Sequence, residues 1–172
     1  KVAVAAPSNA QLPPERPAPA AERAMDFSQL FSEKAVTLNL SSTTKADAIR
    51  EMAGLLEQDG VLSDKAAFIS AVEAREQQFP TGLGDGIAIP HAKTAAVVRP
   101  RVAVGISKAG IDFGSPDNTA AHLIFMIAAS EGENDMHVKT LAEISKRLLD
   151  GDFKQRLLSS SDKGELLNNL VS

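Results

Sequence analysis

The sequence predicts an α/β (α+β) sandwich, in which a small mixed β-sheet is flanked by helices on both faces in the order β-α-α-β-β-β-α-α-α. Apolar residues recur at helical spacing before and after the middle of the chain, and the middle itself holds short apolar runs of strand length. The composition is globular, because 44% of the 172 residues are hydrophobic and 23% are charged. These patterns do not determine the order or direction of the strands.

Residues 1–24 differ in composition from the rest of the chain. They contain 5 of the 9 Pro, 8 Ala and none of the 11 Gly. Proline fixes φ and removes a backbone donor, and alanine offers little apolar surface, so this segment predicts a flexible, extended linker. The folded domain is expected at 25–172. Because the sequence starts with Lys1, the segment fits a linker between two domains of a longer polypeptide, or a remnant of recombinant expression.

The first half of the domain predicts one strand followed by two helices. Apolar and polar residues alternate over 35–40, as in a half-buried strand. Thr44 is placed to cap the first helix and Gly60 to end it, and a second helix follows Ser63 and runs to about Gln78. The side chains expected to face inward from these helices are Ile49, Met52, Ala53, Leu56, Phe68, Ile69 and Val72.

The second half predicts the centre of the sheet and three further helices. The apolar runs have turn residues around them, as expected for strands covered on both faces. Asn134 or Asp135 is placed to cap the first of the later helices, and Gly151 to end it. The expected strands are 87–89, 102–106 and 123–128, and the two short helices after Gly151 are about 152–159 and 162–170.

The composition excludes several classes of function. The chain has no Cys, which rules out disulfides, Cys-ligated zinc and a thiol nucleophile on this polypeptide. With no Trp or Tyr and a net charge of −4, it is not expected to bind nucleic acid. No apolar stretch approaches the length of a membrane-spanning helix, so direct membrane insertion is not expected either. The spacing of the 3 His resembles no compact metal site, and we expect no metal or cofactor.

The most unusual segment is a Gly-rich stretch that ends in a histidine. Gly82, Gly84 and Gly86 allow close backbone approach, but their spacing matches neither a dinucleotide-binding loop nor a P-loop. A hairpin with Asp85-Gly86 as its turn is one interpretation. Pro90 forces the preceding residue into an extended conformation and so presents His91 from a stiff support, where a neutral imidazole is an available nitrogen nucleophile.

These residues carry a resemblance to a known family. The pattern is Glu76, six arbitrary residues, and then Leu83-Gly84-x-x-Ile87-Ala88-Ile89-Pro90-His91-Ala92. It resembles, at every specified position, the phosphorylation-site signature of enzyme IIA domains of the mannitol/fructose class (type 2) of the bacterial sugar phosphotransferase system (PTS). The resemblance covers about residues 25–172 and leaves the linker outside.

The resemblance implies a phosphoryl relay. His91 would accept a phosphoryl group from the histidine-containing phosphocarrier protein, on Nε2 as a tele-phosphohistidine, and pass it to a Cys of an enzyme IIB domain. Fructose is the first choice of sugar and mannitol the second. The implied partners include a membrane IIC domain, in the same or a separate polypeptide. The implied location is the cytoplasm, with a tether to the inner face of the membrane where a transporter is fused or associated.

Two further site residues are expected from the resemblance, and the chemistry suits both. Arg75 would present a fork of donors to the phosphoryl oxygens, although a solvated side chain at a helix C-terminus is the simpler interpretation. His137 shares a helical face with three Leu and Ile residues and would support His91, although a core histidine would look the same. His122 matches no pattern and is expected to be structural. Backbone N–H groups of 82–86 would be further stabilisers.

The resemblance also implies docking partners and leaves a regulatory role open. A relay needs an exposed patch on which two partners dock in turn, and Phe79, Pro80 and Leu83 are candidates for its apolar rim. Some domains of this family act instead as nitrogen-type regulators that bind other proteins according to their phosphorylation state, and the pattern around His91 does not separate the two roles. A folded interaction module without relay activity is the third possibility.

Overall fold

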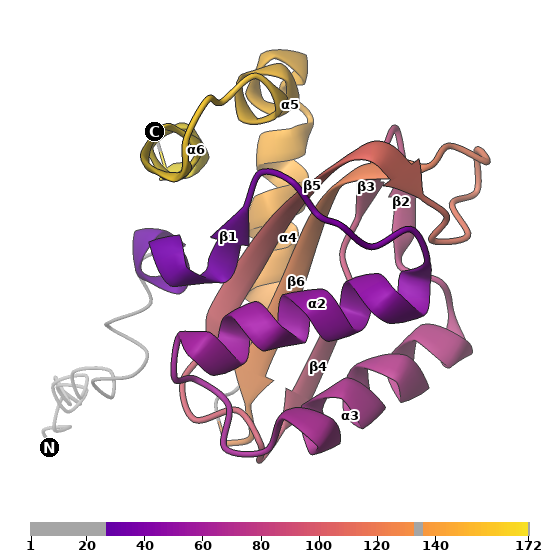
Figure 1. Cartoon of the computed structure of the whole chain (residues 1–172). Coiled ribbons are helices and arrows are strands. Elements are labelled where there is room, and N and C mark those ends of the chain that lie inside the picture. The colour runs from indigo at the N-terminus through magenta and orange to yellow at the C-terminus, as the bar shows by residue number, and fades with distance from the viewer. Residues whose placement is uncertain (1–26, 133–135, 172) are drawn as a thin grey trace, which may run out of the picture.

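The computed structural model describes residues 27–132 and 136–171, and of residues 136 and 137 it describes only the backbone. The expected linker at 1–24 and the expected helix cap at Asn134 or Asp135 lie outside the described residues. The described part forms a central sheet between two layers of helices, as the sequence predicts (Figure 1).

The sheet is mixed and has two long strands at its centre. Strands β5 and β6 run antiparallel through the middle, β1 runs parallel to β5, and β3 and β4 both run parallel to β6. Strand β2 forms an antiparallel hairpin with β3. The bounds are β1 Val36–Thr37, β2 Gly82–Gly84, β3 Ile87–Ala88, β4 His91–Thr94, β5 Arg101–Ile111 and β6 Ala121–Ser130.

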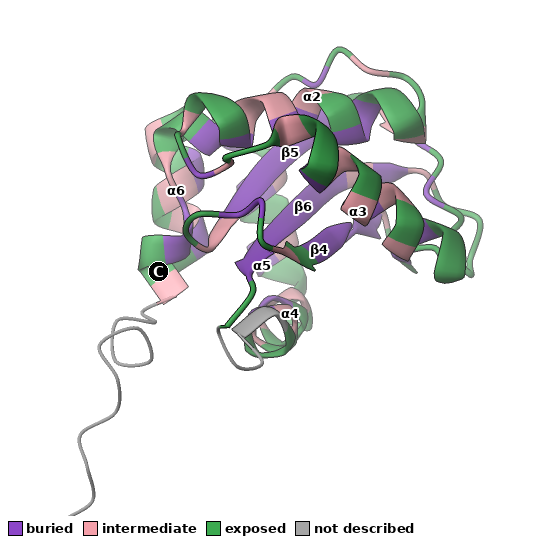
Figure 2. Ribbon diagram, turned by 90° about the horizontal axis from the view of Figure 1, so that it is seen from below, coloured by how far each residue is buried: buried purple, intermediate pink, exposed green. Residues whose placement is uncertain are grey.

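Helices cover both faces of this sheet. Helices α2 and α3 lie on one face and α4, α5 and α6 on the other (Figure 1), and the view from below shows the buried strands enclosed between the two layers (Figure 2). Two short 3₁₀ helices, η1 and η2, precede β1. The bounds are η1 Phe27–Leu30, η2 Glu33–Ala35, α2 Lys45–Gln58, α3 Lys65–Gln78, α4 Met136–Leu148, α5 Gly151–Leu158 and α6 Lys163–Val171.

Local chemistry explains where the first two helices begin and end. The Thr44 side chain accepts the Asp47 N–H at 3.2 Å and caps α2, which stops before Gly60 at a φ of 77°. Asp64 caps α3 by accepting the Ala67 N–H at 3.0 Å, one residue later than the predicted Ser63 boundary.

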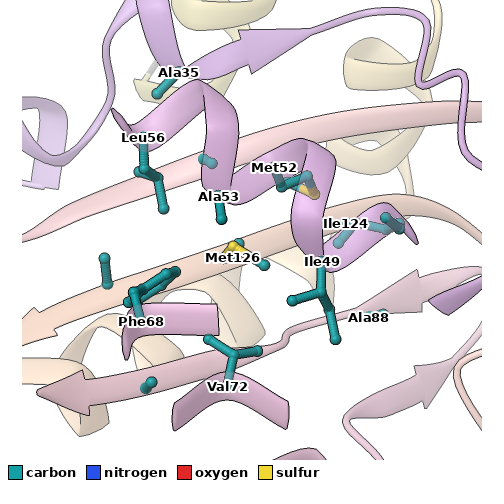
Figure 3. Packing of buried hydrophobic residues seen from close by; sticks show 14 of the residues in the cluster. Ala35, Ile49, Met52, Ala53, Leu56, Phe68, Val72, Ala88, Ile124 and Met126 are labelled. Carbon is teal, nitrogen blue, oxygen red and sulfur yellow. The ribbon is translucent and has the colours of Figure 1, made fainter. Parts of the chain in front are cut away.

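Alternating side chains of the central strands divide the core in two. In β6, Ile124 and Met126 face α2 and α3, whereas Phe125 and Ile127 face α4, α5 and α6. Figure 3 shows the first cluster, in which the inward side chains of α2 and α3 pack against Ile124 and Met126. This two-sided burial explains the continuous apolar runs in the sequence.

The structure differs from the prediction at the strand that leads to His91. The expected strand at 87–89 pairs only as far as Ala88, and the chain rejoins the same edge of β6 at His91 as β4. Pro90 causes the break because it has no N–H for the ladder, although its carbonyl oxygen still accepts the Ile127 N–H at 2.9 Å. His91 therefore begins a strand. The expected strand at 35–40 is likewise shorter, with two residues paired in β1.

Candidate functional site

The sheet positions His91 at the start of β4, directly opposite Ile127 of β6. Opposed residues share a face of a sheet, so the imidazole lies on the face that α4, α5 and α6 cover. The residue is 8% exposed, and its Nδ1 lies 3.0 Å from the carbonyl oxygen of Ile89. Backbone and core together therefore hold the ring.

The bond to Ile89 determines the tautomer of His91. A carbonyl oxygen only accepts, so Nδ1 carries the proton and donates it. The lone pair of the neutral ring is then on Nε2. A backbone carbonyl that orients an imidazole in this way is a common device for fixing which ring nitrogen reacts.

The Gly-rich stretch forms a hairpin, as one interpretation of the sequence predicts. Strands β2 and β3 are joined by Asp85 and Gly86, whose φ angles are 56° and 78°. Positive φ at both central residues is typical of a type I′ turn, which suits a two-residue hairpin.

Three side chains from elsewhere in the chain hold this turn. The Asp117 carboxylate accepts the Asp85 N–H at 2.8 Å, and the Thr119 hydroxyl accepts the Gly86 N–H at 3.2 Å. Lys154 of α5 donates to the Asp85 carbonyl oxygen at 2.7 Å and lies 3.1 Å from its carboxylate. Two of the backbone donors expected to stabilise a phosphoryl group are therefore already bonded to side chains.

Glu76 is a buried carboxylate at the end of α3. It accepts the Thr81 N–H at 2.8 Å and the Thr81 hydroxyl, and Lys45 of α2 donates to it at 3.1 Å. The residue is 5% exposed. The sequence pattern contains Glu76, but sequence reasoning assigned it no role, because its partners Lys45 and Thr81 belong to no recognisable motif.

Arg75 lies in the last turn of α3, and its Nη1 donates to the Phe79 carbonyl oxygen at 3.0 Å. This bond uses one of the five N–H donors of the guanidinium. The following segment is exposed and apolar, because Phe79 is 72% and Leu83 45% exposed and Pro80 is also exposed.

His137 lies in the first turn of α4, and its side chain lies outside what the structure describes. Helix α4 packs on the same face of the sheet as His91, through residues such as Ile144. The structure thus places the helix that carries His137 on the face of the sheet where His91 lies, and the role of His137 stays a prediction.

His122 has a structural position in β6. Its Nδ1 donates to the Ser107 carbonyl oxygen of β5 at 2.8 Å, and its ring packs over Gly110, where a Cβ atom would lie 3.0 Å from the imidazole. Within residues 27–132 and 136–171, no three His, Asp or Glu side chains gather in a way that could hold a metal ion. None of the described helices is both long and apolar enough to cross a membrane.

Comparison with protein families gives a match over nearly the whole described chain. The family described as "Phosphoenolpyruvate-dependent sugar phosphotransferase system, EIIA 2" matches residues 29–172.

Named relatives fall into two groups. A "PTS system fructose-specific EIIABC component" of Bacillus subtilis is 40% identical over 84% of this chain, which spans only 23% of that relative's length. A "PTS system fructose-specific EIIA component" of Haloferax volcanii is 36% identical over 80% of this chain and 90% of the relative. A "Nitrogen regulatory protein" of Bradyrhizobium diazoefficiens is 30% identical over 80% of this chain and 90% of the relative.

The solved structures that resemble this chain also include a nitrogen regulatory protein and sugar-specific IIA proteins. The nitrogen regulatory protein IIA-Ntr of Neisseria meningitidis superposes with a TM-score of 0.77 at 25% identity, over 84% of this chain and 98% of its own. IIA mannitol of Escherichia coli superposes with a TM-score of 0.70 at 27% identity, over 81% of this chain and 97% of its own. Enzyme IIA mannitol of the same organism, solved in complex with phosphorylated enzyme IIB mannitol, superposes with a TM-score of 0.71 at 27% identity. The match covers 82% of this chain and 98% of that chain.

Proposed function

Because the chain belongs to the EIIA 2 family of the phosphoenolpyruvate-dependent sugar phosphotransferase system, and is thus a phosphotransferase component, we propose that His91 relays a phosphoryl group between two partner proteins. The donor is the histidine-containing phosphocarrier protein, and the acceptor is a Cys of an enzyme IIB domain that serves fructose uptake. A relative with fused A, B and C components supports the IIB partner, as does the solved complex of enzyme IIA mannitol with phosphorylated enzyme IIB mannitol.

The observation that carries the proposal is the bond from Nδ1 of His91 to the Ile89 carbonyl oxygen. With the proton on Nδ1, the Nε2 lone pair attacks the phosphorus of the donor's phosphohistidine. A new P–N bond forms as the donor's P–N bond breaks, and the donor ring keeps that electron pair. In the second step a thiolate of IIB attacks the phosphorus, the P–N bond at His91 breaks, and its electron pair returns to Nε2. Nδ1 keeps its proton throughout.

Charge stabilisation is the remaining task of the site, because the charge of such a transition state spreads over the phosphoryl oxygens. Arg75 and His137 supply it in this proposal: Arg75 through donors that the bond to Phe79 leaves over, and His137 from the helix that covers the His91 face. Of the backbone donors of 82–86, those of Asp85 and Gly86 are assigned to the turn instead.

Phosphorylation by purified partners tests the relay. The protein is incubated with phosphoenolpyruvate, enzyme I and the phosphocarrier protein, and its intact mass is measured. We expect a gain of one phosphoryl group, its loss in His91→Ala, and its retention in His122→Ala as the matched histidine control. An unchanged gain in His91→Ala would overturn the assignment.

A regulatory role is the second candidate, favoured by the nitrogen regulatory relatives and by the superposition on IIA-Ntr. Both roles share phosphorylation at His91 and differ in the fate of the phosphoryl group. Adding a purified fructose-specific IIB domain to the phosphorylated protein separates them. Rapid loss of the phosphoryl group to the IIB cysteine supports transport, whereas a stable phosphoprotein in its presence supports regulation.

A further inference from the structure

One residue of the sequence pattern has no part in the relay chemistry. Glu76 lies at the end of α3, fifteen positions before His91, and touches no reacting atom in the scheme above. It is nevertheless almost fully buried and accepts three hydrogen bonds. A buried carboxylate costs free energy unless its partners compensate, so its position calls for a physical reason.

Hydrogen bonds connect this carboxylate to the ring of His91. Glu76 accepts both the N–H and the hydroxyl of Thr81. The Thr81 carbonyl oxygen accepts the Ile89 N–H at 3.0 Å, and the Ile89 carbonyl oxygen accepts the Nδ1–H of His91 at 3.0 Å. Each bond constrains the next peptide in the series, and Pro90 prevents the chain between Ile89 and His91 from relaxing freely.

Lys45 of α2 also holds the carboxylate. Its Nζ lies 3.1 Å from Glu76 Oε2, the same oxygen that accepts the Thr81 N–H. Lys45 is 31% exposed, and the pair lines a hollow of about 400 Å³ between α2 and α3. Water thus reaches the lysine side of the pair, while Thr81, which is 4% exposed, closes the other side.

We propose that Glu76, held by Lys45, is a positioning residue that fixes the tautomer and orientation of the His91 ring through Thr81 and Ile89. This inference rests on the proposed relay for its consequence, because a ring held with the proton on Nδ1 has its lone pair on the nitrogen that attacks phosphorus. Without Glu76, the Thr81 backbone loses its anchor, and the Ile89 carbonyl oxygen no longer has a fixed place relative to Nδ1.

Nitrogen NMR of the imidazole provides the test, because the ¹⁵N shifts of a histidine report which ring nitrogen carries the proton. In the wild-type protein we expect His91 as the Nδ1–H tautomer. In Glu76→Ala we expect the ratio of Nδ1–H to Nε2–H to fall at least threefold, and in Glu76→Gln, which keeps an acceptor for the Thr81 N–H, to lie between the two. A wild-type ratio in Glu76→Ala would overturn the proposal.

Glu51 of α2 offers a matched control. Its carboxylate accepts the N–H groups of Ser41 and Ser42 and the Ser42 hydroxyl, so it holds a loop in the same manner as Glu76 but elsewhere in the fold. We expect Glu51→Ala to leave the His91 tautomer ratio unchanged. An equal change in Glu51→Ala and Glu76→Ala would assign the effect to general loosening and overturn the proposal.

Reaction rates give the second readout. With the phosphocarrier protein as donor, we expect Glu76→Ala to accept a phosphoryl group on the order of 10- to 100-fold more slowly than the wild type, and Glu51→Ala to stay within about twofold. If Glu76→Ala does not fold, Thr81→Val replaces it, because it removes the hydroxyl bond at nearly constant volume. The tautomer readout needs no donor, so failure of the wild type to be phosphorylated would reject the relay and leave the positioning role to be decided by NMR.

Discussion

The Asp117 carboxylate accepts the backbone N–H of Asp85 at 2.8 Å, although the two residues are 32 positions apart and Asp117 lies in the exposed loop between β5 and β6. The same carboxylate accepts the N–H and the hydroxyl of Thr119, whose hydroxyl in turn accepts the Gly86 N–H. The loop between β5 and β6 thereby holds the turn between β2 and β3, which precedes His91.

This arrangement predicts how the turn responds to acid. The Asp85 N–H, followed by the bonds from Thr119, lowers the pKa of Asp117 below its ordinary value of 3.8. A carboxyl group with a lowered pKa stabilises the folded state fully above its unfolded value and loses that effect as the pH falls through the folded value. We expect the amide proton shifts of Asp85 and Thr119 to titrate together with a midpoint below 3.8, and this titration to be absent in Asp117→Asn. A midpoint at or above 3.8 would contradict the hydrogen bonding assigned to Asp117.

Lys154 of α5 also holds this turn, from the layer formed by α4, α5 and α6. Replacing it with Met removes the bonds to the Asp85 carbonyl oxygen and carboxylate. Because Asp85 is largely exposed, we expect the loss in unfolding free energy to stay below about 1 kcal/mol. Amide hydrogen exchange in the β2–β3 hairpin should accelerate in Lys154→Met. It should not accelerate in Lys65→Met, which removes an exposed ion pair with Glu57. Unchanged exchange in the hairpin would show that Lys154 does not anchor it.

Gly82 begins β2 where the backbone meets the β5–β6 loop. A Cβ atom there would overlap the Ser115 hydroxyl and lie 2.9 Å from the Phe113 carbonyl oxygen. We expect Gly82→Ala to destabilise the protein by about 1–3 kcal/mol. Gly54 lies within α2 with no atom in the way, so Gly54→Ala should stabilise by about 0.5–1 kcal/mol. Denaturant unfolding measures both, and equal effects of the two substitutions would refute the close contact at Gly82.

The exposed side chain of Phe79 is expected to contact the relay partners. It is the first residue after α3, four positions after Arg75, and it is 72% exposed, so it contributes little to the core. We expect Phe79→Ser to slow phosphoryl transfer from the phosphocarrier protein by about tenfold or more while the unfolding free energy stays within about 0.5 kcal/mol.

Leu149 provides the control for this prediction. It is 87% exposed and lies just beyond the C-terminal end of α4, twelve residues and thus about 18 Å of helix from His137. Leu149→Ser should leave the transfer rate unchanged. A similar slowing in both variants, or none in Phe79→Ser, would argue against docking at Phe79.

Features encoded by neighbouring residues could be predicted from the sequence. Thr44 and Gly60 bound α2 as expected, because a cap and a positive-φ terminator act within one turn of helix. The apolar runs of β5 and β6 predicted the sheet centre, because strands buried on both faces need no alternation. The pattern around His91 indicated the candidate nucleophile through its resemblance to the family signature, with Pro90 constraining the backbone locally, and the role of His91 stays a prediction.

Features that depend on residues far apart in the sequence could not be predicted. Strand β4 contains His91, Lys93 and Thr94 and shows no apolar run, so only its pairing with β6 reveals it as a strand. The roles of Glu76 and Asp117 depend on partners from other elements, and no spacing rule connects them. The arrangement of β3 and β4 along one edge of β6 is also a property of the whole sheet.

The position of the phosphoryl group on the His91 ring is the decisive measurement for the proposed relay. The bond from Nδ1–H to the Ile89 carbonyl oxygen leaves the lone pair of the neutral ring on Nε2, which is the nucleophile in the proposed relay. Phosphorus-coupled ¹⁵N NMR of the phosphorylated, ¹⁵N-histidine-labelled protein identifies the bonded nitrogen. We predict a single phosphohistidine at His91 with the P–N bond at Nε2, and phosphorylation at Nδ1 or at another histidine would contradict the relay as proposed.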